Sequence, residues 1–193
     1  MNRVIPIGFI ICLFLSACSA DKRSPLNTSF YNGQGDKIGT ATLKEMSDGV
    51  QVKVKVEGLE PGPHAIHVHE FPKCKAPDFK SAGNHFNPMS KLHGLMNAEG
   101  AHAGDLPNIE ADSAGMVNAE LMLPDATLKD GQKSLLRKEG TSLVIHSGVD
   151  DGMTQPAGDS GERFACAKIT LDADKNETSD PTEPMEKQKK SSK

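Results

Sequence analysis

Alternation of apolar and polar residues dominates the middle of the chain. In residues 50–56 every second position is valine, and the positions between them are Gln51, Lys53 and Lys55. Side chains of a β-strand point alternately to opposite faces, so this run predicts a strand with one buried face and one solvated face. Ser47, Asp48 and Gly49 precede the run and favour a turn.

Further short stretches have strand character, and none shows the long apolar stripe of an amphipathic helix. The other strand candidates are residues 38–43, 65–70, 116–123, 142–146 and 164–171. Residues 33–36 and 112–115 are rich in Gly and Asp and read as turns. Many short strands separated by such turns predict an all-β domain, either an antiparallel sandwich or a barrel.

Two long stretches lack strand character, residues 71–114 and 147–163. Loops of this length in a compact domain usually have a function or are held by something other than backbone pairing. The first stretch contains three of the seven histidines, so we expect a metal ion to help order it.

The first seventeen residues predict an export signal. Arg3 is followed by an almost continuously apolar run over residues 4–15. That run is shorter than the roughly 20 residues needed to span a bilayer and matches a secretory h-region. It ends in Leu15-Ser16-Ala17-Cys18, which resembles a bacterial lipobox. We therefore expect Cys18 to be lipidated and to anchor the protein at the extracytoplasmic side of the cell membrane; the alternative is an ordinary signal peptide.

The chain divides into four predicted parts. They are a signal peptide at 1–17, a lipidated tether at 18–27, one folded domain at 28–171 and a disordered charged tail at 172–193. The length suits a single domain with its own core. The tail contains no Ile, Val, Leu or Phe, which is typical of disorder.

Composition excludes some partners and leaves two cysteines to be explained. The net charge is −4 and the one lysine cluster lies at the extreme end, so nucleic acid binding is not expected.

Two cysteines belong to the predicted domain. Cys12 is removed with the signal peptide, so Cys74 and Cys166 remain. An exported protein meets oxidising conditions, so a disulfide is the natural inference; the alternative is two unpaired thiols.

The histidines supply the candidate chemistry. His67 and His69 fall in a predicted strand, where residues two apart share a face about 6.6–6.8 Å apart and can converge on one metal. His146 stands at the end of another predicted strand, just before the second long loop. Either observation alone is a weak indication of a metal site.

A second group lies in the first long loop. It comprises His85, His93, His102 and Asp105. Three ring nitrogens and one carboxylate would make a closed tetrahedral site that suits structural zinc. The alternative is a set of surface histidines in a polar loop, which would leave the order of so long a loop unexplained.

Taken together and in this order, the motifs resemble those of the copper–zinc superoxide dismutase family, over about residues 30–170. The matching segments are residues 64–70, 82–88, 91–94, 102–106, 143–146 and 161–166. The resemblance implies an eight-stranded antiparallel Greek-key β-barrel, an immunoglobulin-like sandwich with two long functional loops. It also implies one copper and one zinc ion per chain and superoxide as the substrate.

The resemblance assigns roles to individual positions. The implied copper ligands are His67, His69, His85 and His146. The implied zinc ligands are His85, His93, His102 and Asp105, with His85 bridging the two ions and taking part in proton transfer. Asp150 would link a copper ligand to a zinc ligand, Arg163 would guide the superoxide anion, and Cys74 would be bonded to Cys166.

The sequence also departs from the family pattern. The segment between Cys74 and His85 is longer than in the eukaryotic enzymes, and residues 147–163 are shorter and contain no lysine, so extra basic steering residues are not expected there. Two other functions compete with dismutation: a surface lipoprotein that buffers copper or zinc, and a structural domain that needs zinc alone. A homodimer is possible, but the sequence does not choose between monomer and dimer.

Overall fold

The computed structural model describes residues 25–172, and within that range the chain forms nine β-strands and one short 3-10 helix. The strands are β1 (Leu26–Asn32), β2 (Lys37–Met46), β3 (Gly49–Val56), β4 (Gly62–His64), β5 (Ile66–His69), β6 (Ile109–Ala111), β7 (Val117–Leu123), β8 (Thr141–His146) and β9 (Arg163–Ile169). The helix, η1, spans Lys80–Ala82.

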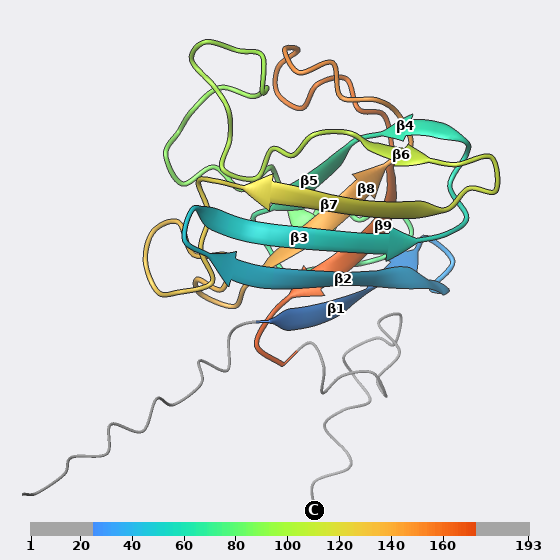
Figure 1. The fold of residues 1–193 in the computed structure, drawn as a ribbon, viewed down its shortest axis with the longest axis horizontal. Helices are drawn as coiled ribbons and strands as arrows, with labels where there is room; N and C mark the ends of the chain where they lie inside the picture. Colours follow the sequence, from blue (N-terminus) through green and yellow to red (C-terminus); the bar gives the residue numbers. More distant parts are fainter. Residues whose placement is uncertain (1–24, 173–193) are drawn as a thin grey trace, which may run out of the picture.

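Seven of these strands form one antiparallel sheet in the order β5-β8-β9-β1-β2-β3-β7. The other two, β4 and β6, pair with each other. Only Ala65 separates β4 from the edge strand β5, and residues 112–116 connect β6 to the opposite edge strand β7. The β4–β6 ribbon therefore lies between the two edges of the curled sheet and completes a barrel. In Figure 1, β5, β8 and β9 cross behind β2, β3 and β7.

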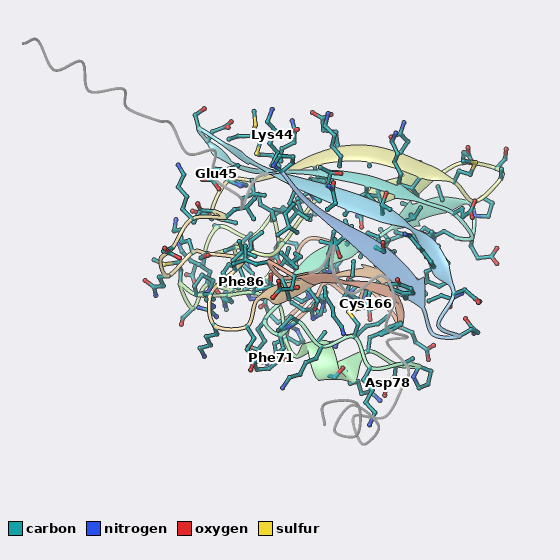
Figure 2. All side chains as sticks on the ribbon, turned by 90° about the horizontal axis from the view of Figure 1, so that it is seen from below. Lys44, Glu45, Phe71, Asp78, Phe86 and Cys166 are labelled. Carbon is teal, nitrogen blue, oxygen red and sulfur yellow. A yellow bond between two sulfur atoms is a disulfide. The ribbon has the colours of Figure 1, made fainter. Side chains whose placement is uncertain are left out.

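The core fills the space between these two layers, as Figure 2 shows from below. The four valines of residues 50–56 are buried, whereas Lys53 and Lys55 on the other face are exposed. The half-buried strand that the alternation predicts is therefore confirmed. Strand β8 is buried along its whole length, because the sheet continues on both sides of it and the long loops cover its end.

The all-β fold class is confirmed, but the strand count differs from the expected eight. Each predicted strand corresponds to an observed one, while β1, β4 and β6 were not predicted. Strands β4 and β6 contain three residues each, too few to show a period of two. Strand β1 turns Thr28 inward beside Leu26 and Phe30, so its polarity pattern is weak, and its first two residues fall within the expected tether.

The predicted signal peptide, the lipidation site Cys18 and all but the first residue of the predicted tail lie outside residues 25–172. Within those residues no helix is long and apolar enough to cross a membrane.

Candidate metal centre

Strands β5 and β8 bring three histidines together at one end of the barrel. The two strands pair directly, with His67 opposite Val144. His67 and His69 lie on β5 and His146 is the last residue of β8. The first long loop adds a fourth, because the backbone of His85 forms an isolated bridge with that of His69.

Two groups of side chains result, and they share one member. The first group is His67, His69, His85 and His146, all buried. The second group is His85, His93, His102 and Asp105, of which only His102 is partly accessible. In each group one ligand atom per residue lies within 4.8 Å of the others. The structure thus brings together every residue for which the sequence suggested a metal-binding role.

The first group presents four buried ring nitrogens without hydrogen-bond partners among the described residues. They are His67 Nδ1, His69 Nε2, His85 Nε2 and His146 Nε2. A buried polar atom without a partner is unfavourable by roughly 1–3 kcal/mol, so four in one place indicate a missing ligand. Imidazole nitrogens suit copper and zinc alike, so the donor set fits either ion.

The opposite nitrogens of these rings are held by acceptors. His69 Nδ1 lies 3.0 Å from the carbonyl oxygen of Gly83, and His67 Nε2 lies 2.7 Å from Asp150 Oδ2. A carbonyl or an ionised carboxylate can only accept, so these ring nitrogens carry the protons. The free nitrogens of these two rings, His67 Nδ1 and His69 Nε2, therefore keep their lone pairs for a metal ion.

Asp105 organises the second group. Its Oδ1 lies 2.9 Å from His85 Nδ1 and 3.3 Å from His102 Nδ1, and its Oδ2 lies 3.1 Å from His93 Nδ1. The backbone N–H groups of Gly94 and His102 each donate to Oδ2 at 3.0 Å. Three imidazoles around one carboxylate have the composition of a closed zinc site.

Asp150 connects the two groups from the second long loop. Its Oδ2 is the oxygen that contacts His67 of the first group, and its Oδ1 lies 3.1 Å from His93 Nε2 of the second. Asn108 fixes the Asp150 backbone, accepting from its N–H and donating to its carbonyl oxygen, both at 2.9 Å. A carboxylate in this position sets the orientation and protonation of both rings.

Burial sets the charge state of the site. Desolvation lowers the pKa of His85 to about 4 and that of His146 to about 3, and it lowers the pKa of His69 well below its ordinary value. These imidazoles are therefore neutral near pH 7 and able to bind a metal ion. For Asp105 burial acts in the opposite sense, but hydrogen bonds from His102, His85 and His93 outweigh it and hold the pKa low.

Arg163 begins β9 and lines an open pocket beside the first group. Its two terminal nitrogens donate to the carbonyl oxygens of Phe79 at 2.8 Å and Gly83 at 2.7 Å. Burial lowers the pKa of Arg163, but the ordinary value is so high that the guanidinium stays cationic. The pocket therefore contains a fixed positive charge.

A disulfide and a backbone contact hold the two loops in place. The Cys74–Cys166 disulfide, predicted from the sequence, is confirmed and ties the first loop to β9. In the second contact, a side chain on Gly94 would come within 2.0 Å of the Gly152 carbonyl oxygen, so only glycine fits there. Gln155 also accepts from the His93 N–H at 2.9 Å and donates to its carbonyl oxygen at 2.8 Å.

Sequence reasoning missed several residues of this pocket, among them a second arginine. Arg137, from the connection between β7 and β8, lines the same pocket as Arg163. The complete lining is His69, Glu70, Asn84, His85, Asn87, His102, Arg137, His146, Pro156, Ala157 and Arg163. No local motif surrounds Arg137, and its guanidinium lies over the ring of Phe86, a residue distant in sequence.

Comparison with known proteins gives one consistent result. Residues 37–169 match the model of the family described as copper/zinc superoxide dismutase (SODC). The chain is 45% identical to "Superoxide dismutase [Cu-Zn] 1" of Aquifex aeolicus over 161 residues, which cover 82% of this chain and 95% of that protein. It is 39% identical to "Superoxide dismutase-like protein YojM" of Bacillus subtilis, covering 88% and 96%. The crystal structure of Cu/Zn superoxide dismutase from Brucella abortus superposes with a TM-score of 0.63 at 31% identity, covering 76% of this chain and 99% of that one.

Proposed function

Because the chain belongs to the copper/zinc superoxide dismutase family, we propose that it converts superoxide into dioxygen and hydrogen peroxide at the two-group centre around His85. Two superoxide anions and two protons give one molecule of each product. One superoxide loses an electron and the other gains one.

The observation that carries the proposal is the set of four buried, partnerless ring nitrogens of the first group. We assign copper to His67, His69, His85 and His146, and zinc to His85, His93, His102 and Asp105. When bound, copper supplies one-electron exchange between Cu(II) and Cu(I), and zinc supplies fixed positive charge and structural support.

His85 has the position needed to handle a proton. It alone belongs to both groups, with Nδ1 facing Asp105 and Nε2 facing the first group without a partner. In the proposed reaction His85 Nε2 would take up a proton from solvent when it is not serving as a metal ligand, and would give it to the reduced oxygen species. A second proton from solvent completes hydrogen peroxide. Asp105 and Asp150 keep the neighbouring rings oriented during this transfer.

Arg163 supports the choice of an anionic substrate. Its guanidinium is fixed by two backbone carbonyls and still lines the open pocket, so its charge attracts superoxide towards His69, His85 and His146. A metal-buffering protein would have no need of a fixed cation there.

The proposal is tested on protein beginning at residue 20, refolded under oxidising conditions with copper and zinc. We expect one copper and one zinc ion per chain and rapid superoxide consumption. Full metal loading without superoxide consumption would instead favour the metal-buffering function.

We also propose that the protein acts on the extracytoplasmic side of the cell membrane, held by lipid on Cys18. The support is the sequence of residues 1–18 alone. In cells, Cys18→Ser should move the protein from the detergent-extracted membrane fraction to the soluble fraction, whereas Cys12→Ser should leave it in the membrane. Continued membrane association of Cys18→Ser would contradict a lipid anchor.

A further inference from the structure

A second guanidinium shares the pocket with Arg163. Arg137 comes from residues 124–140, the connection between β7 and β8, and not from either of the two long loops. It lines the pocket together with His69, His85 and His146. The lysines that are absent from residues 147–163 thus have a basic counterpart on a different segment.

Arg137 is held in a way that leaves its charge available. Its guanidinium carbon lies 4.8 Å from the centre of the Phe86 ring, a cation–π distance. Phe86 is fully buried and directly follows His85. Among residues 25–172, no hydrogen bond or ion pair occupies the Arg137 guanidinium, whereas that of Arg163 donates to two carbonyls.

The backbone around Arg137 is also fixed. Its N–H donates to the Ser134 carbonyl oxygen at 3.3 Å, and its own carbonyl oxygen accepts from the Gly140 N–H at 2.9 Å. Leu135, two residues before it, is completely buried in the core. These contacts hold the side chain at the pocket without using its charge.

The charge balance of the pocket depends on Arg137. Glu70 is the one carboxylate in the described lining, and Arg163 alone would only offset it. With Arg137 the side chains of the lining carry a surplus of one positive charge, apart from the histidines. Beyond Arg137, Lys73, Lys138 and Glu139 line an adjoining pocket.

We propose that Arg137 is a second anion-guiding residue of this centre, and that it draws small monovalent anions, superoxide among them, into the pocket. The proposal rests on the function proposed above in naming superoxide, and its test also uses the copper assigned there to the first group. The underlying inference is that Arg137 raises the affinity of the pocket for a monovalent anion.

The test compares Arg137→Gln with Lys138→Gln in the full-length, metal-loaded protein. Both changes remove one positive charge from adjacent residues, but Lys138 lies outside the metal pocket. The first measurement is equilibrium binding of azide, a monovalent anion that ligates copper, followed by the visible absorption of the copper centre. Arg137→Gln should weaken azide binding about two- to fivefold at low salt, and Lys138→Gln should change it much less.

The second measurement is the superoxide rate constant across a salt series. At 0.01 M salt the rate constant of Arg137→Gln should be about two- to fivefold below that of the wild type. The difference should vanish near 1 M salt, because the screening length falls from about 30 Å to about 3 Å. Copper and zinc content should equal those of the wild type, since Arg137 is not in either metal-binding group. Equal effects of the two Gln variants on azide binding would overturn the proposal.

Two further outcomes remain informative. If Arg137→Gln does not fold, Arg137→Lys keeps the charge and should bind azide within about twofold of the wild type; a loss as large as that expected for glutamine would overturn a charge-based role. If the wild-type protein binds azide but does not consume superoxide, the proposed function fails while azide binding still tests Arg137.

Discussion

The sheet of β1, β2, β3 and β7 and the two long loops bury different kinds of side chain. In the sheet the buried residues are mainly apolar, and Leu43, Val52 and Val54 are fully inaccessible. The stretches predicted as loops are shorter in the structure, 71–108 with the helix η1 and 147–162, because β6 and β9 take up their ends. They bury apolar residues such as Phe86, but also the ionisable His85, His93, Asp105 and Asp150. In Figure 1 the light-green part of the first loop and the orange second loop lie side by side at the top, away from β1.

This difference shows which part of the molecule depends on bound metal ions. Apolar side chains gain free energy from burial without any partner. Buried ring nitrogens gain it only when they are bonded. Five of them have no hydrogen-bond partner among the described residues, and two of these, on His85 and His93, belong to the first loop. The sheet should therefore be stable without bound ions. The order of the loops should depend on metal ions, on the buried carboxylates and on the Cys74–Cys166 disulfide.

The largest expected effect is on activity, from a substitution at the metal centre. His146→Ala should abolish superoxide consumption, because the first group loses one of its four nitrogens. Zinc should stay bound, since His146 is not in the second group. Metal analysis and a superoxide assay check both statements. Unchanged activity would refute the copper assignment.

The next effect is the response of the metal-free protein to acid. The pKa of His85 is lowered to about 4 and that of His146 to about 3, so between pH 7 and 5 the unfolded chain takes up protons that these folded residues do not. His69 acts in the same direction. His93 opposes them, because although burial lowers its pKa, Asp105 and Asp150 outweigh burial and raise it.

The free energy of unfolding should therefore fall by a few kcal/mol from pH 7 to pH 5, since each unit of pKa shift corresponds to about 1.4 kcal/mol. Asp105 and Asp150 contribute nothing in this window, because their ordinary pKa lies below it. Urea titrations of the metal-free protein at the two pH values measure the change. His146→Gln should have a shallower pH dependence, and a flat profile for the wild type would contradict the assignment of neutral, buried histidines.

A smaller effect is expected in the sheet. Leu43→Ala removes a fully buried side chain from β2 and should lower the free energy of unfolding by about 2–5 kcal/mol. Metal content and activity per folded molecule should not change, because Leu43 belongs to neither metal-binding group. Leu171→Ala is the control, since Leu171 is 57% exposed. Loss of metal from Leu43→Ala would show that the two regions are coupled.

The same contrast explains how much the sequence could predict. Residues 50–56 predict β3 because burial on one face imposes a period of two, and the strand follows from local pattern alone. The second group stands out because three His and one Asp fall close together in one loop, whereas the first group was assigned only through the resemblance to the family. Cys74 and Cys166 could be paired because few cysteines remain in the domain.

Features that depend on contacts distant in sequence could not be predicted in this way. Strands β4 and β6 have three residues each and are strands only because they pair with each other, 45 residues apart at His64 and Ile109. Arg137 reaches the pocket through its contact with Phe86, which no local pattern announces. A single sequence carries the local preferences of such residues but not the register that brings them together.

The smallest effect, and the one that probes the connection between the two metal-binding groups, is expected for Asp150→Asn. The substitution keeps the size of the side chain and its place in the second loop, but it replaces one acceptor oxygen by an N–H donor. The lost oxygen faces either His67 Nε2 at 2.7 Å or His93 Nε2 at 3.1 Å, so one ring loses its acceptor and can turn or change its protonated nitrogen. Loss of an outer carboxylate of this kind typically lowers metal affinity about 10- to 100-fold.

The matched control is Asp159→Asn. Asp159 is an exposed residue of the same loop, and its positive φ of 51° is one that asparagine tolerates well. Competition with a chelator measures copper and zinc affinity separately. Because the substitution also removes the negative charge that acts on both His67 and His93, both affinities should fall in Asp150→Asn and neither in Asp159→Asn. A fall in zinc affinity alone would mean that Asp150 acts through His93 only and that the first group is oriented without it.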